Sequence, residues 1–180
     1  MNPGIELKVF DDLSYGLYIL TSFDQDRKNG QIINTAVQVT ADPLQVEVIV
    51  NKNNLTHEYI QKSRLFAVSV LDESTPFPLI GLFGFRSGRE TDKLAQVKHE
   101  GGMTGCPLVT DHALSFFEAK VTANIDIGSH TIFIGHPVRS EVLSDGKPLT
   151  YQYYCQVMKG KSPPNAPTFR PANAIKKSMK

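Results

Sequence analysis

The chain has 180 residues, a formal net charge of +1, and a composition of 41% hydrophobic and 21% charged residues. A chain of this length is expected to form one domain, or one domain with a tail, and to bury a core that needs no metal or disulfide. The nearly balanced charge argues against a nucleic-acid-binding surface, and the run of about 18 apolar residues needed by a transmembrane helix is missing.

Seven segments have the length and apolar content of β-strands. They are residues 15–21, 33–39, 46–50, 66–71, 117–127, 131–135 and 138–143. The strongest signal lies in 117–127, where apolar and polar residues alternate, which predicts one dry face and one wet face that carries Glu118. Strands so closely spaced predict a mainly β protein, with the sheet closed into a barrel.

The predicted helices are few and short, and they are expected to pack outside the barrel. One covers residues 56–62, with Thr56 as a possible N-cap. A second covers 76–83, where Ser74 or Thr75 would be the cap and proline lies near the first turn. Residues 87–90 have the spacing of a capping box and could open a further helical turn.

The cysteine and histidine patterns give little sign of metal or redox sites. Cys106 and Cys155 are 49 residues apart and belong to no CxxC motif, which suggests reduced thiols. The histidines lack paired-ligand spacing, so no metal is expected. The first 20 residues carry charges that do not fit a signal peptide. These features together predict a cytoplasmic protein.

The last residues differ in composition from the rest, so the chain is divided into a domain at 1–158 and a tail at 159–180. The tail holds six Lys or Arg residues and no Asp or Glu, and its prolines favour an extended chain. The simpler interpretation is a solvated, partly disordered end. The alternative is a segment that binds an acidic partner protein.

Two clusters of hydrogen-bond donors are candidates for binding an anion. The first opens the helix predicted at 56–62, where free N–H groups and the helix dipole favour a phosphate. Its members are Asn51, Lys52, Asn53, Asn54 and Thr56. The second combines a glycine with cations, and its members are Arg86, Ser87, Gly88, Arg89 and Lys93. The alternative interpretations are a capped polar turn and a solvated loop with local ion pairs.

Three segments together resemble the flavin reductase-like family with an FMN-binding split barrel. They are 30–57, 81–93 (GLFGFRSGRETDK) and 128–135 (GSHTIFIG). Within that family the chain is most similar to flavoredoxin and to the N-terminal flavoprotein domain of high-molecular-weight rubredoxins, from about residue 13 to 169. The resemblance implies a split β-barrel with a few short peripheral helices, FMN as cofactor, and a homodimer.

The resemblance also assigns further residues to the site. Those expected to line the isoalloxazine ring are Gln31, Asn34, Thr35 and Gln38, with Thr21 and Ser22 as further candidates. Asn34 and Gln38 are four residues apart, so on one strand they would share a face. His130 is expected on the nicotinamide side of the flavin, as the catalytic residue that hydrogen-bonds the reductant or relays a proton. Tyr151, Tyr153 and Tyr154 could cover the ring from a neighbouring subunit or simply pack the structure.

The function implied is reduction of flavin by NAD(P)H, with electrons passed to free flavin or to a redox protein such as a rubredoxin. No G-x-G-x-x-G motif follows a strand, so NAD(P)H would dock as a transient substrate. Unlike the fused relatives, the chain has no CxxC pairs for a rubredoxin iron site. The alternatives are a flavoredoxin-type carrier reduced by another protein, a cofactor-free interaction domain, and a reductase of a metal or organic substrate.

Overall fold

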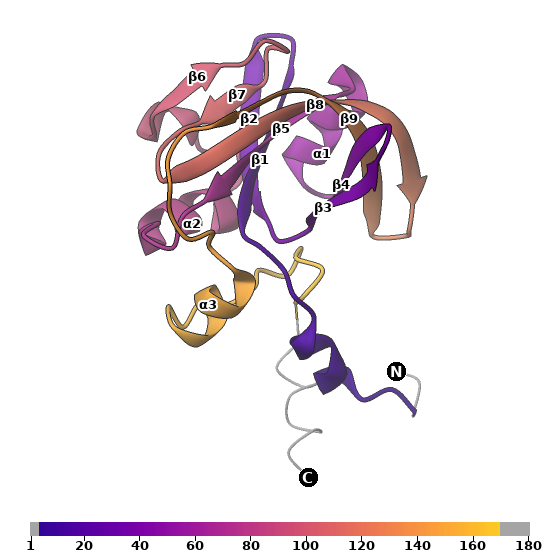
Figure 1. Cartoon of the computed structure of the whole chain (residues 1–180), viewed down its shortest axis with the longest axis vertical. Coiled ribbons are helices and arrows are strands. Elements are labelled where there is room, and N and C mark those ends of the chain that lie inside the picture. Colours follow the sequence, from indigo (N-terminus) through magenta and orange to yellow (C-terminus); the bar gives the residue numbers. More distant parts are fainter. Residues whose placement is uncertain (1–3, 170–180) are drawn as a thin grey trace.

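The computed structural model describes residues 4–169 and contains a curled, antiparallel seven-stranded sheet (Figure 1). The strands run in the order β2-β1-β5-β8-β9-β4-β3 across this sheet, and a separate hairpin pairs β6 with β7. Their bounds are β1 Tyr18–Asp24, β2 Arg27–Ile33, β3 Ala36–Ala41, β4 Leu44–Asn51, β5 Leu65–Leu71, β6 His99–Gly101, β7 Pro107–Val109, β8 Ala113–Asp126 and β9 His130–Val142. The prediction of a mainly β barrel is confirmed.

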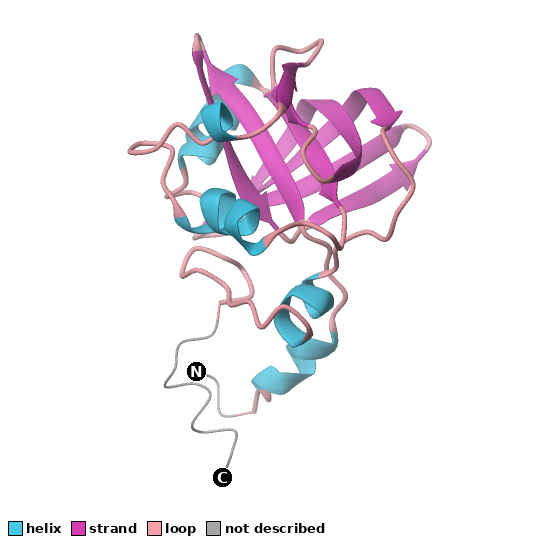
Figure 2. Ribbon diagram, turned by 90° about the vertical axis from the view of Figure 1, so that its left-hand side faces the viewer, coloured by secondary structure: helices cyan, strands magenta, loops and turns pink. Residues whose placement is uncertain are grey.

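The helical elements are short and lie around the barrel (Figure 2). They are η1 Leu7–Asp12, α1 Leu55–Ser63, α2 Phe77–Phe85, η2 Leu94–Gln96 and α3 Tyr151–Gln156. The inside of the barrel is filled by large apolar side chains, among them Leu20, Val48, Phe66 and Phe133, all fully buried. A second apolar cluster joins α2 and α3 to the outside of β1. This second cluster positions one wall of the site described below.

Two strand predictions are wrong in their bounds. Residues 33–39 are not one strand, because the chain breaks at Asn34 and Thr35 between β2 and β3. Asn34 and Gln38 therefore share no face: the first is buried and the second is exposed. Residues 131–135 and 138–143 are not two strands but parts of β9, which continues past Pro137 with a register shift against β8. A bulge of this kind accommodates proline within a strand.

The predicted dry and wet faces of β8 are wrong at both ends. Glu118, expected on the wet face, is fully buried. Its carboxylate accepts hydrogen bonds from the main-chain N–H groups of Met103 and Thr104, at 3.0 and 2.8 Å, because the loop between β6 and β7 covers this face. At the other end Ile125 and Ile127 are half exposed, since the outer part of the β8–β9 hairpin extends beyond the barrel (Figure 1).

The helix starts also differ from prediction. The N-cap of α1 is Asn54 rather than Thr56, and α2 begins after Pro76 with no side-chain cap from Ser74 or Thr75. Residues 87–90 form a single hydrogen-bonded turn, in which the N–H groups of Glu90 and Thr91 donate to the carbonyl of Ser87. Within residues 4–169 no helix is long and apolar enough to cross a membrane.

Residues 159–169 do not extend into solvent as a tail. After α3 the chain turns back at Lys159, which has a φ of 60°, and Gly160 packs against the ring of Tyr154. A Cβ on Gly160 would lie 2.1 Å from that ring, so the turn depends on glycine there. The following residues contact Asn34 and Asn54 through Thr168 and Asn165, although none of residues 161–169 is buried. The basic residues at 170–180 lie outside the described part of the chain.

Candidate functional site

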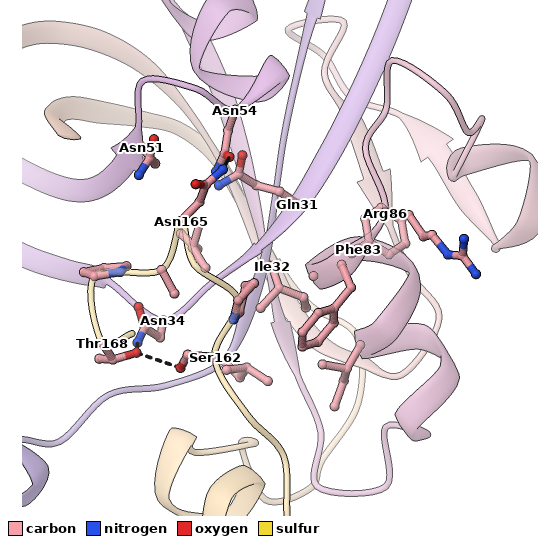
Figure 3. A pocket seen from close by; sticks show the side chains of 18 of the residues that line it. Gln31, Ile32, Asn34, Asn51, Asn54, Phe83, Arg86, Ser162, Asn165 and Thr168 are labelled. Carbon is pink, nitrogen blue, oxygen red and sulfur yellow. Dashed lines mark hydrogen bonds between the residues drawn. The ribbon is translucent and has the colours of Figure 1, made fainter. Parts of the chain in front are cut away.

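A cavity of about 270 Å³ lies between the barrel and the returning C-terminal segment (Figure 3). Its walls come from β2, the start of α1, the C-terminal half of α2, and α3 with residues 161–168. Apolar side chains such as Ile32 and Phe83 form part of the wall, and amide side chains surround them. A slot with apolar walls and a few polar groups is the usual form of a small-molecule site.

Half of the cofactor-binding residues predicted from sequence line this cavity. They are Gln31, Asn34, Asn51, Asn54, Arg86, Ser87, Gly88 and Lys93. Figure 3 shows that the guanidinium of Arg86 points away from the other labelled side chains. Both predicted donor clusters thus contribute residues to the same cavity.

Asn29 of β2 is the point where the two clusters meet. Its side-chain amide donates to Thr56 Oγ1 of α1 at 2.8 Å, and both residues are buried. On the other side Gly88 lies so close that a Cβ there would be 2.0 Å from Asn29 Oδ1. Asn29 therefore sets the spacing between the start of α1 and the loop after α2.

Lys93 brings a buried positive charge to the cavity. Its side chain is 4% exposed, and its ammonium group donates to the carbonyl of Arg86 at 3.2 Å and lies 5.5 Å from the centre of the Phe83 ring. Burial lowers the pKa of Lys93 to about 8. No carboxylate pairs with it among the described residues. A buried cation without an acidic partner suits an anionic ligand.

Two buried acceptors in the cavity have no hydrogen-bond partner within the described structure: Gln31 Oε1 and Asn34 Oδ1. Leaving such atoms unpaired is costly in a folded protein, so they indicate a ligand with N–H donors. The lining residues include the cations Arg86, Lys93 and Lys161 but no Asp or Glu from the described chain. The cavity is therefore suited to an anionic ligand that also carries hydrogen-bond donors.

The other predicted residues lie outside the cavity, and four of them are buried. Thr21 donates to the carbonyl of Pro107 at 2.6 Å, and Ser22 to that of Leu65 at 2.8 Å. Thr35 donates to the carbonyl of Ile49, while Thr56 accepts from Asn29. These hydrogen bonds join neighbouring elements of the barrel, so the four residues support the site from behind.

The remaining four of these outlying residues are at least partly exposed. Lys52 forms an ion pair with Asp126 at 2.6 Å, and Arg89 forms one with Glu58 of α1. The side chain of Gln38 bonds the carbonyl of Thr40. The main-chain N–H of Asn53 donates to Asn51 Oδ1 at 2.9 Å. None of these four residues lines the cavity.

His130 lies at the rim, as the first residue of β9, opposite Asn51 of β4. Its Nδ1 is 2.9 Å from Ser129 Oγ, and its Nε2 donates to the carbonyl of Asn165 at 3.2 Å. The imidazole is thus held by the C-terminal segment, and it does not line the cavity directly.

Sequence reasoning missed several residues of the wall. Asn29 and Phe83 carry no distinctive motif, and they reach the cavity only through pairing of β2 and packing of α2. Tyr151 and Tyr154 line the cavity from the same chain, not from a neighbour, and burial raises the pKa of both phenols. Residues 161–168 belong to the predicted tail; the polar side chains spaced among their prolines were the available signal.

Comparisons with known proteins agree with this geometry. A family model described as flavin reductase like domain matches residues 10–158. The high molecular weight rubredoxin of Moorella thermoacetica is 47% identical over 92% of this chain and 72% of that protein. The ferric-chelate reductase (NAD(P)H) of Archaeoglobus fulgidus is 46% identical over 92% of this chain and 98% of that protein. An FMN-binding protein from Thermus thermophilus, solved with bound 1-cyclohex-2-enone, matches with a TM-score of 0.70 and 25% identity over 82% of each chain.

Proposed function

The chain belongs to the flavin reductase-like family and is an oxidoreductase of that kind, and from this premise we propose that it binds FMN in the cavity and takes electrons from NAD(P)H. The observation that carries the proposal is the combination of apolar walls, two unpartnered buried acceptors and a buried lysine without a carboxylate. When bound, the flavin supplies the two-electron chemistry, and the protein supplies position and electrostatics.

Each part of the cavity has a task in this proposal. The two unpaired oxygens, Asn34 Oδ1 and Gln31 Oε1, take different donors of the flavin: one accepts from the ring N3–H and the other from a ribityl hydroxyl. Lys93 and the loop at Gly88 hold the phosphate, helped by the N-terminus of α1 at Asn54. The names of two relatives, an NAD(P)H-dependent ferric-chelate reductase and an FMN-binding protein, support this assignment.

His130 is proposed as the residue that orients the nicotinamide. It lies at the rim, where a second ligand has to enter, and its Nε2 already carries a hydrogen bond to a carbonyl. An amide group of a nucleotide could take that place. Hydride transfer needs no general base, so loss of His130 is expected to slow turnover without abolishing it.

A second candidate function is an electron carrier reduced by another protein. The relative named as a rubredoxin supports a redox protein as acceptor, and the one named as a ferric-chelate reductase supports a metal chelate.

Anaerobic reduction tests the two functions against each other. We expect NADH or NADPH to bleach the visible absorbance of the FMN-loaded protein much faster than that of free FMN in the same buffer. Bleaching by dithionite but by neither nucleotide would favour the carrier. A protein that stays colourless after incubation with FMN and gel filtration would refute both.

We propose, as the resemblance implies, that two copies form a dimer through the outer face of β3, β4, β8 and β9. This face carries a row of apolar pairs, in which Ile125 lies opposite Ile132 and Ile132 opposite Ile49, with Glu47 beside them opposite Val37. Val37 of the edge strand β3 and Ile125 are about half exposed. Ile49 also lines the cavity, so a partner on this face would lie next to the site. Exposed apolar surface on an edge strand is commonly covered by a partner.

Replacing Ile125 with Glu should prevent dimer formation, because the charge would be buried at the interface without a partner. Sedimentation of the wild type should give about twice the chain mass and that of Ile125→Glu the mass of one chain. Gln152→Glu, which adds the same charge at an exposed position of α3 outside the proposed interface, is the control. A wild-type protein that sediments as a monomer would contradict the proposed dimer.

A further inference from the structure

Residues 161–168 cover the cavity on its outer side, and their contacts fall on residues assigned above to the site. Asn34 Nδ2 donates to Thr168 Oγ1 at 3.0 Å, and Asn165 Nδ2 donates to Asn54 Oδ1 at 2.9 Å. The carbonyl of Asn165 accepts from His130. Figure 3 shows the two groups of contacts, Thr168 beside Asn34 and Asn165 beside Asn54. Three elements of the barrel are therefore bound to one short segment.

The segment is attached firmly at only one end. Tyr154 of α3 donates from its hydroxyl to the carbonyl of Lys161 at 3.0 Å, and the turn at Gly160 packs on the same ring. Beyond that point none of residues 161–169 is buried. A segment held by exposed hydrogen bonds and little buried apolar surface opens at low cost, whereas α3 is held by its core contacts.

Prolines make the segment stiff, so it is expected to move as a unit. Pro163, Pro164 and Pro167 fix their φ angles, and the N–H of Ala166 donates to the carbonyl of Pro163 at 2.9 Å. Within the segment Ser162 Oγ and Thr168 Oγ1 lie 3.0 Å apart. These internal bonds persist when the contacts to Asn34 and Asn54 break. Lys161 and Ser162 stay bonded to Tyr154 and Tyr151 of α3, so the segment turns about this attached end.

We propose that residues 161–168 are a gate over the cavity, which closes on the first ligand and must open before a second ligand can reach it. The inference rests on the proposed function, because the first ligand is the flavin and the second is a nicotinamide nucleotide. When the gate is closed, Asn34 keeps its Nδ2 turned outward and its Oδ1 free for the ligand. The same closed gate occupies His130 and Asn54, so the second ligand and the gate compete for these residues.

The first experiment measures release of FMN from the preloaded, full-length protein after it is mixed with an excess of a flavin-binding trap. The double variant Asn165→Ala/Thr168→Val loses both side-chain contacts to the barrel, and we expect release to be about tenfold faster or more, as follows from the loss of one to two hydrogen bonds. The control is Asn124→Ala/Thr110→Val, the same pair of substitutions at positions whose bonds are long and away from the cavity. Equal release rates in the wild type, the double variant and the control would overturn the proposal of a gate.

The second experiment needs no flavin. Backbone ¹⁵N relaxation of residues 162–169 is compared among the same three flavin-free proteins. Greater mobility in the double variant alone is expected, because a segment released from Asn34 and Asn54 moves as a unit while its internal bonds persist. Unchanged relaxation would show that the contacts to Asn34 and Asn54 do not hold the segment. Failure of the proposed function gives a different result: NAD(P)H does not bleach the absorbance of the FMN-loaded protein.

Discussion

Replacing Lys93 with Met should weaken FMN binding by about tenfold to a hundredfold, and should leave riboflavin binding nearly unchanged. A charge-assisted hydrogen bond contributes about 1.5–3 kcal/mol, and each factor of ten corresponds to about 1.4 kcal/mol. Lys93 is the buried cation of the cavity, so a phosphate there gains more from it than from an exposed side chain. Riboflavin has no phosphate and loses only packing.

The same substitution should make the flavin-free protein more stable. A pKa that falls from 10.5 to about 8 corresponds to a cost of about 3 kcal/mol for the charged form of Lys93 at neutral pH. Met removes this cost and keeps an apolar stem against Phe83, so the midpoint of thermal unfolding should rise by a few degrees. Loss of ligand affinity together with a gain of stability is characteristic of a residue kept for function.

The pH dependence follows from the same pKa. Between pH 8 and about 10 the unfolded chain binds a proton at Lys93 that the folded protein does not, so the contribution of this residue makes the flavin-free protein more stable as pH rises through that window. FMN affinity changes in the opposite direction, because the neutral amine above pH 8 no longer attracts the phosphate. In Lys93→Met, the contribution of residue 93 to the pH dependence of stability and to that of FMN affinity should both disappear.

Calorimetric titration with FMN and riboflavin at pH 7 and pH 9 checks these expectations. Lys62→Met is the matched control, because it removes an exposed lysine of α1 that pairs with Asp24 away from the cavity. If Lys93→Met loses the same affinity for both ligands, Lys93 does not meet the phosphate.

Replacing Gly88 with Ala should also lower FMN affinity by about tenfold or more. The new Cβ would lie 2.0 Å from Asn29 Oδ1 and 2.6 Å from its Cγ, and the buried Asn29 side chain has to move. Movement breaks its hydrogen bond to Thr56 and separates the two donor clusters. Overpacking of this kind costs about 1–3 kcal/mol of stability, so both affinity and stability should fall.

Gly81→Ala is the control for this variant, because a Cβ on Gly81 meets nothing within 4 Å and the residue lies in the middle of α2. It should raise stability by about 0.5–1 kcal/mol and leave FMN affinity unchanged. Fluorescence titration and urea unfolding of both variants supply the two quantities. Wild-type affinity in Gly88→Ala would contradict the role of Asn29 as the junction of the two clusters.

Local patterns predicted most of the strands correctly because alternation is a property of neighbouring residues. The segments around Val48, Val68 and Val121 all form strands of the barrel. The errors occur where a contact distant in sequence changes the environment of a residue. Glu118 occupies a position that the alternation assigns to the solvent-facing side. In the structure the loop of the β6–β7 hairpin covers it and donates two main-chain hydrogen bonds to its carboxylate.

Local sequence also predicted which residue types form the candidate site, but it did not predict where their side chains lie. Asn34, Asn54 and Lys93 were identified as donors from their types and neighbours. Lys52 and Arg89 are equally good donors for a phosphate, but in the structure they pair with carboxylates outside the cavity. No pattern in the sequence indicates these ion pairs. A charged side chain is directed by whichever partner the fold brings close, and that partner is distant in the chain.

The sequence by itself determined the class of fold, the donor-rich segments and the family, because these depend on residue types and short spacings. Only the tertiary structure decided which donors share a cavity, that Asn29 joins them, and that residues 161–168 close it. The bond between Asn34 and Thr168 spans 134 positions of the chain. Such a contact forms only when the barrel and the turn at Gly160 have already brought its ends together, and no local pattern records it.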